Sequence, residues 1–135
     1  MSRSGLVLVA VVIVACLPAR TIETRFEAFP DVEALRIVVH DKTGLIVAVQ
    51  PAPPDLVREG VSNVPGRPDV LLVKWVGGMC DKKTDLTFER EALRYRFVEQ
   101  TDRASGCLLA GIFRTLQIQL SAGVPAAAVD LVSVP

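Results

Sequence analysis

The sequence predicts an all-β protein: a single antiparallel β-sandwich of about seven strands, with Ig-like architecture and one disulfide. Three observations lead to this fold class: short runs that alternate apolar and polar residues, turn-forming residues between the runs, and no long amphipathic helix. The chain of 135 residues suits one domain. Its formal net charge of zero argues against a nucleic-acid-binding protein, which needs a basic face for phosphate contacts.

The expected domain covers residues 35–135. Its strands are expected at residues 35–41, 45–50, 70–76, 84–89, 93–98, 112–120 and 129–134. The first two are rich in β-branched residues and flank the polar turn Asp41–Gly44, a pattern that predicts a hairpin. Residues 51–68 are rich in proline and are expected to form a long loop.

Strand 70–76 is nearly all apolar, as in a central strand that is covered on both faces. The later strands alternate, which assigns their side chains to an inner or an outer face. The side chains expected to point inward are Thr84, Leu86, Phe88, Leu93, Tyr95, Phe97, Leu116, Ile118 and Leu120. Arg94 and Arg96 are expected to point outward.

Residues 1–15 have the parts of an export signal peptide: one arginine near the start, then the apolar run Leu6–Ala15. As a helix that run rises only about 15 Å, half of a hydrocarbon core. Residues Ile13–Cys16 resemble the lipobox of bacterial lipoprotein signals. The resemblance implies cleavage before Cys16 and a diacylglycerol on its sulfur, with residues 16–34 forming a lipidated N-terminus and tether.

A plain secretory cleavage and an uncleaved weak anchor are the alternatives for this leader. All three interpretations place the domain outside the cytoplasm, anchored to the cell membrane or, for plain secretion, free.

The chain has three cysteines. Lipidation of Cys16 would leave one pair, and in an oxidising compartment Cys80 and Cys107 are expected to form a disulfide. Such a bond would stabilise the fold by roughly 3.5 kcal/mol in the chain-entropy model. Metal binding is the alternative for these cysteines, but no CxxC or Cys/His spacing supports it. No metal or cofactor is therefore expected.

The segment from Trp75 to Asp81 (Trp-Val-Gly-Gly-Met-Cys-Asp) has the highest concentration of candidate functional residues in the chain. Strand parity places Arg114 on the inner face, where a buried guanidinium needs a carboxylate or carbonyl partner. Asp81 is the candidate partner. Trp75, Asp81 and Arg114 could line a binding site, or they could be a core aromatic, a turn cap and an internal ion pair.

The Trp-x-Gly-Gly-x-Cys-Asp segment, the Asp41–Gly44 turn and the later Cys107 followed by Arg114 together resemble uncharacterised lipoproteins of high-GC bacteria. The excess of arginine over lysine fits such a genome. The resemblance implies an exported single β-domain and carries no activity with it.

No catalytic residues are identified. His40 and Asp41 are neighbours in an expected strand and point to opposite faces, so they form no relay, and His40 is expected at the surface. Nucleophile-elbow, P-loop and dinucleotide fingerprints are missing from the sequence. We do not expect an enzyme.

The expected function is therefore a membrane-anchored extracytoplasmic lipoprotein that acts as a binding or structural module of the cell envelope. Its expected partners are the membrane, through the lipid, and a protein or envelope polymer. Loop 51–68 and the Arg94/Arg96 face are the candidate contact surfaces. The alternative is a secreted inhibitor or small-ligand carrier; a small envelope hydrolase is less favoured.

Overall fold

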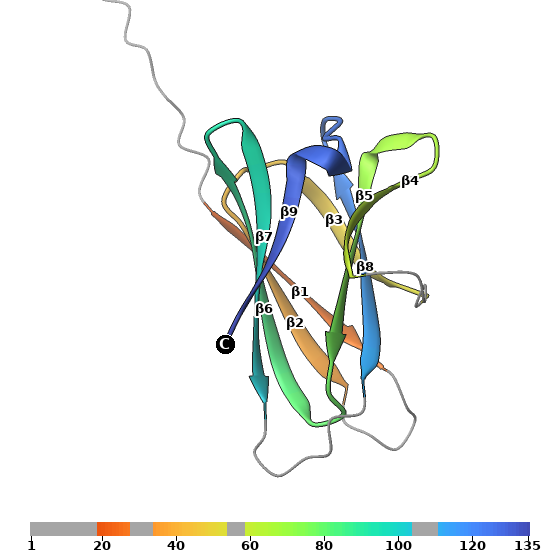
Figure 1. Ribbon diagram of the computed structural model, residues 1–135, viewed down its shortest axis with the longest axis vertical. Coiled ribbons are helices and arrows are strands. Elements are labelled where there is room, and N and C mark those ends of the chain that lie inside the picture. Colours follow the sequence, from red (N-terminus) through yellow and green to blue (C-terminus); the bar gives the residue numbers. More distant parts are fainter. Residues whose placement is uncertain (1–18, 28–33, 54–58, 104–110) are drawn as a thin grey trace, which may run out of the picture.

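The computed structural model describes residues 19–27, 34–53, 59–103 and 111–135. This part of the chain contains nine strands and one short 3₁₀ helix (Figure 1). The elements are β1 (Arg20–Phe26), β2 (Leu35–Asp41), β3 (Ile46–Ala52), β4 (Gly60–Val64), β5 (Arg67–Gly77), β6 (Asp81–Glu91), β7 (Arg94–Arg103), β8 (Ile112–Leu120), η1 (Ala126–Ala128) and β9 (Val129–Val134).

The strands form two sheets, one in the order β1-β2-β6-β7-β9 and one in the order β3-β8-β5-β4. The two sheets face each other in a β-sandwich-like arrangement (Figure 1). Apolar side chains from both sheets form one core. The first sheet contributes Leu35, Ile37, Val39, Leu86, Phe88, Phe97 and Val129 to this core; the second contributes Ile46, Leu71, Val73, Trp75, Leu116, Ile118 and Leu120. The predicted all-β class is confirmed.

Strand pairing is antiparallel throughout the second sheet. The first sheet departs from the antiparallel prediction, because β2 pairs with β6 and β7 pairs with β9 in parallel. Parallel neighbours need a long connection between them. Here the chain leaves the first sheet after β2 and after β7, builds strands of the second sheet, and then returns.

The predicted hairpin between residues 35–41 and 45–50 is wrong. Both strands form, but β2 belongs to the first sheet and β3 to the second, so their connecting turn crosses between the sheets. Asp41 holds this turn and is fully buried. Its Oδ1 accepts hydrogen bonds from Thr43 N (2.9 Å), Thr43 Oγ1 (2.7 Å) and Gly44 N (3.1 Å), and its Oδ2 accepts one from Ile46 N (3.0 Å).

Two strands lie where the sequence predicted none. Residues 20–26, expected within a tether, form β1 and pair with all of β2. Residues 60–64, expected within a loop, form β4 and pair with β5. Both strands lie at sheet edges, where one side of the strand meets solvent. Their residues are therefore largely polar and do not show the apolar alternation that predicts a strand. Residues 54–58 of the expected loop lie outside the described residues.

The expected central strand 70–76 is confirmed within β5: Val70 and Leu71, on opposite faces, are both buried. The inward positions of β6 and β8 are also confirmed. Leu93 is an exception, because it is 86% exposed at the end of the β6–β7 hairpin. Among the described residues, no helix has the length and apolar character needed to cross a membrane.

Candidate functional site

The three residues predicted as a possible site meet inside the molecule. Trp75 on β5 lies directly opposite Arg114 on β8, and both side chains are buried. The Arg114 Nη1 donates to Asp81 Oδ2 at 2.5 Å, and its Nη2 donates to the Gly78 carbonyl at 3.0 Å. Asp81 begins β6 in the first sheet, so this ion pair joins the two sheets.

The glycines at the end of β5 make room for this contact. A Cβ on Gly77 would lie 2.5 Å from Asp81 Oδ2 and closer still to the Arg114 guanidinium, so the position accepts no side chain while the ion pair is in place. The Gly78 N–H donates to Asp81 Oδ2 at 2.8 Å and closes the turn toward β6. The local sequence Gly-Gly-x-x-Asp therefore shapes a turn and an enclosed guanidinium site together.

This arrangement favours the internal ion pair over a binding site. Arg114 is 3% exposed and Asp81 8% exposed, so neither charge is open to a partner. Trp75 is 1% exposed, as a core aromatic would be. Within the described ranges, three buried atoms have no hydrogen-bond partner: Trp75 Nε1, Arg114 Nε and Thr115 Oγ1. These unsatisfied groups lie on two neighbouring strands of the second sheet.

The cysteines are only partly described. Cys80 lies half-buried in the turn before Asp81. Cys16 and Cys107 lie outside the described residues, as do residues 1–15, so the lipidation, the signal peptide and the Cys80–Cys107 disulfide stay predictions. The described residues contain no group of three or more His, Cys, Asp or Glu side chains that could hold a metal ion.

The outer face of the first sheet is covered by charge pairs. His40 Nε2 lies 2.8 Å from Asp85 Oδ1, with Lys83 Nζ 3.4 Å from the same oxygen. His40 is thus partly exposed and contacts Asp85, not its neighbour Asp41. Partial burial raises the pKa of Asp85, but the hydrogen bonds and charges of His40 and Lys83 outweigh it, so the pKa lies below its usual value.

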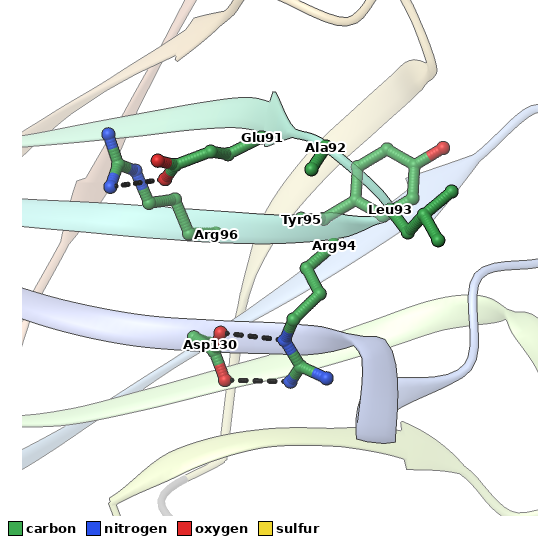
Figure 2. A pocket seen from close by; sticks show the side chains of 7 residues that line it. All are labelled: Glu91, Ala92, Leu93, Arg94, Tyr95, Arg96 and Asp130. Carbon is green, nitrogen blue, oxygen red and sulfur yellow. Dashed lines mark hydrogen bonds and ion pairs between the residues drawn. The ribbon is translucent and has the colours of Figure 1, made fainter.

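The end of the β6–β7 hairpin carries a surface pocket. A pocket of about 370 Å³ is lined there by Glu91, Ala92, Leu93, Arg94, Tyr95, Arg96 and Asp130 (Figure 2). Ala92 has a left-handed backbone, with φ 53°, which is uncommon for a residue other than glycine. This tight turn places Leu93 in solvent. The alternation of apolar and polar residues predicted that Leu93 points inward. It failed because Leu93 lies in the turn, where side chains no longer alternate between the two faces of a strand.

Arg94 and Arg96 point outward, as predicted, and each is paired with carboxylates of the described residues. Arg94 donates from Nε and Nη2 to both carboxylate oxygens of Asp130, at 3.0 and 2.9 Å (Figure 2). Arg96 pairs with Glu89 and, at 2.7 Å, with Glu91. The hydrogen bonds with Asp130 and Glu89 raise the pKa values of the two guanidinium groups.

Comparisons of the sequence and the structure with protein-family models, with curated proteins and with solved structures gave no match.

Proposed function

We propose that this protein is an extracytoplasmic lipoprotein, anchored through Cys16, that serves as a non-enzymatic binding or structural module of the cell envelope. The observation that carries the proposal is the short distance along the chain between Cys16, the proposed lipidation site, and the fold. β1 begins at Arg20, four residues after Cys16. A lipid on Cys16 would therefore hold the domain directly against the membrane.

The enclosure of the chemistry-bearing residues supports a non-enzymatic role. Asp81 and Arg114 neutralise each other inside the sandwich, and the outward arginines Arg94 and Arg96 are paired with carboxylates. A catalytic site needs such groups within reach of a substrate. In this geometry they stabilise the fold and its surface instead.

A Cys80–Cys107 disulfide and an Ig-like identity belong to the same proposal. Arg103, the last residue of β7, is the ladder partner of Asp81, which adjoins Cys80. Ile112, the first residue of β8, is the ladder partner of Gly77. The segment that carries Cys107 thus leaves and rejoins the sheets beside the Cys80 turn, which supports a short covalent link there.

The intact mass of the full chain, expressed in a bacterium and extracted from membranes, tests this proposal. The expected chain begins at Cys16, carries acyl groups, and gains two hydrogens on reduction. In a Cys16→Ala variant the acyl mass should be lost, whereas a Cys107→Ala variant should keep the acyl mass and lose the response to reductant. An uncleaved wild-type chain with an unmodified Cys16 would contradict the proposal.

A further inference from the structure

We infer that the end of the β6–β7 hairpin rests in the membrane surface, with Leu93 as its apolar contact, so that the domain is held by a lipid and by a protein loop together. This inference rests on the proposed lipid anchor at Cys16. The proposed partner of the hairpin end is a phospholipid bilayer. Strand direction, chain length and the chemistry of the hairpin end support this contact.

Strand direction places the start of β1 and the hairpin at the same end of the molecule (Figure 1). Arg20 is the ladder partner of Asp41. Asp41 is the ladder partner of Phe88, which in turn pairs with Phe97. The first residue of β1 therefore lies level with Phe88, three residues before the hairpin end of the β6–β7 ladder, and the hairpin extends beyond that level.

Chain lengths match this placement. From Phe88 to Ala92 the hairpin extends four residues, about 13 Å at the rise of a β-strand. From Cys16 to Arg20 the chain also has four residues, and full extension would give it at most about 14 Å. Because β1, β2 and β6 are neighbours about 5 Å apart, a membrane that holds Cys16 lies within reach of the hairpin end.

The hairpin end has the chemistry of a membrane-surface contact. Leu93 is 86% exposed, and Figure 2 shows its side chain and the Tyr95 ring on the side away from Asp130. The Arg90 guanidinium lies 5.6 Å from the centre of the Tyr95 ring. Leucine inserts among acyl chains, while tyrosine and arginine are typical of the head-group level.

The pairing of the nearby charges favours a bilayer contact over simple electrostatic adsorption. Arg94 and Arg96 are matched by Asp130, Glu89 and Glu91, so the hairpin carries little net charge. Attraction to anionic head groups alone would be screened by salt. An apolar contact by Leu93 should persist at high ionic strength.

Tryptophan fluorescence in vesicles with brominated acyl chains tests the inference. The full lipidated chain is reconstituted in phosphatidylcholine vesicles containing brominated phosphatidylcholine. The native Trp75 is buried in the core and gives a constant background. A Leu93→Trp variant places a second indole at the hairpin end. A Met79→Trp variant is the matched control, because Met79 is 39% exposed in the turn before β6, at the opposite end of that strand.

We expect the lipid to quench Leu93→Trp at least about twofold more than Met79→Trp, in low salt and in 0.5 M salt alike, because bromine quenches only indoles in or near the acyl region. Equal, weak quenching in vesicle-bound, acylated protein would overturn the inference and leave the anchor intact. Quenching that disappears in high salt would also overturn it, in favour of electrostatic adsorption. Protein that stays unbound with an unmodified Cys16 would overturn both the anchor and the inference.

Discussion

Arg114 on β8 and Asp81 at the start of β6 form an ion pair between the two sheets, with Nη1 and Oδ2 2.5 Å apart. Their side chains are 4% and 2% exposed. Removing one member of such a pair leaves an uncompensated buried charge, whereas removing both does not. We expect Arg114→Met and Asp81→Leu each to lower the free energy of unfolding by about 3–5 kcal/mol. The double variant should lose much less than the sum, as urea denaturation would measure.

The exposed pair Arg94–Asp130 provides the control for the single and double variants of Arg114 and Asp81. Arg94→Met should lower the free energy of unfolding far less than either buried single variant, because solvent screens the exposed pair. If the buried single variants cost less than about 1 kcal/mol, the ion pair is not structural, and the interpretation of Asp81 and Arg114 as a binding site would gain support.

Gly77 makes room for this ion pair, and a single methyl group should disturb it. The Cβ of Gly77→Ala would overlap Asp81 Oδ2 and the Arg114 guanidinium. We expect a loss of about 2–4 kcal/mol, because overpacking would separate two buried charges. Gly123→Ala is the control: its Cβ would make an ordinary contact with Pro68 at 3.7 Å. Thermal unfolding of both variants checks the prediction, and equal midpoints would contradict it.

The buried face of each alternating strand could be predicted from the sequence. The parity of Leu116, Ile118 and Leu120 placed Arg114 inside, and the need of a buried guanidinium for an anion pointed to Asp81. This worked because the alternation of a β-strand is a local property, and the cost of an unpaired buried charge leaves few partners.

Which sheet a strand joins could not be predicted in the same way. A turn that carries Asp41 and Gly44 suits a hairpin and a crossing between sheets equally, so the β2–β3 pattern did not distinguish them. The edge strands β1 and β4 lack strong apolar alternation because they are half-exposed. The exposure of Leu93 and the left-handed backbone of Ala92 depend on where the β6–β7 turn lies. The alternation of apolar and polar residues does not locate a turn to the residue.

Asp41 should be among the most sensitive polar residues in the fold. Its fully buried carboxylate accepts hydrogen bonds from three backbone N–H groups and one hydroxyl in the turn between the sheets. Asp41→Ala would leave these donors without their partner, and we expect a loss of about 3 kcal/mol or more in urea denaturation.

The neighbouring Lys42 serves as a comparison for Asp41. Lys42→Ala removes only an exposed pair with Glu89 at 3.6 Å and should cost less than about 1 kcal/mol. Similar losses in the two variants would mean that the Asp41 turn does not hold the sheets together.

Acid should weaken the fold through carboxylates that bind arginine on its surface. The hydrogen bonds of Arg67 and then Gln119 lower the pKa of Asp69 to about 2, from its usual 3.8. Because this pKa is lower in the folded state than in the unfolded chain, the unfolded chain binds the proton first as the pH falls. The stability from Asp69 is therefore complete above about pH 4 and is lost as the pH falls toward 2. Arginine partners lower the pKa values of Glu23, Glu89 and Asp130 in the same direction.

We therefore expect the urea midpoint to be constant at neutral pH and to fall steadily between about pH 4 and pH 2. Asp69→Asn should reduce the slope in this window, because the variant has no carboxylate to protonate at this position. Arg67→Gln should raise the pKa of Asp69 toward 3.8, as an NMR titration of its carboxyl carbon would measure, because the largest cause of the shift is removed. An unchanged carboxyl titration in Arg67→Gln would show that the Arg67–Asp69 contact is not maintained in solution.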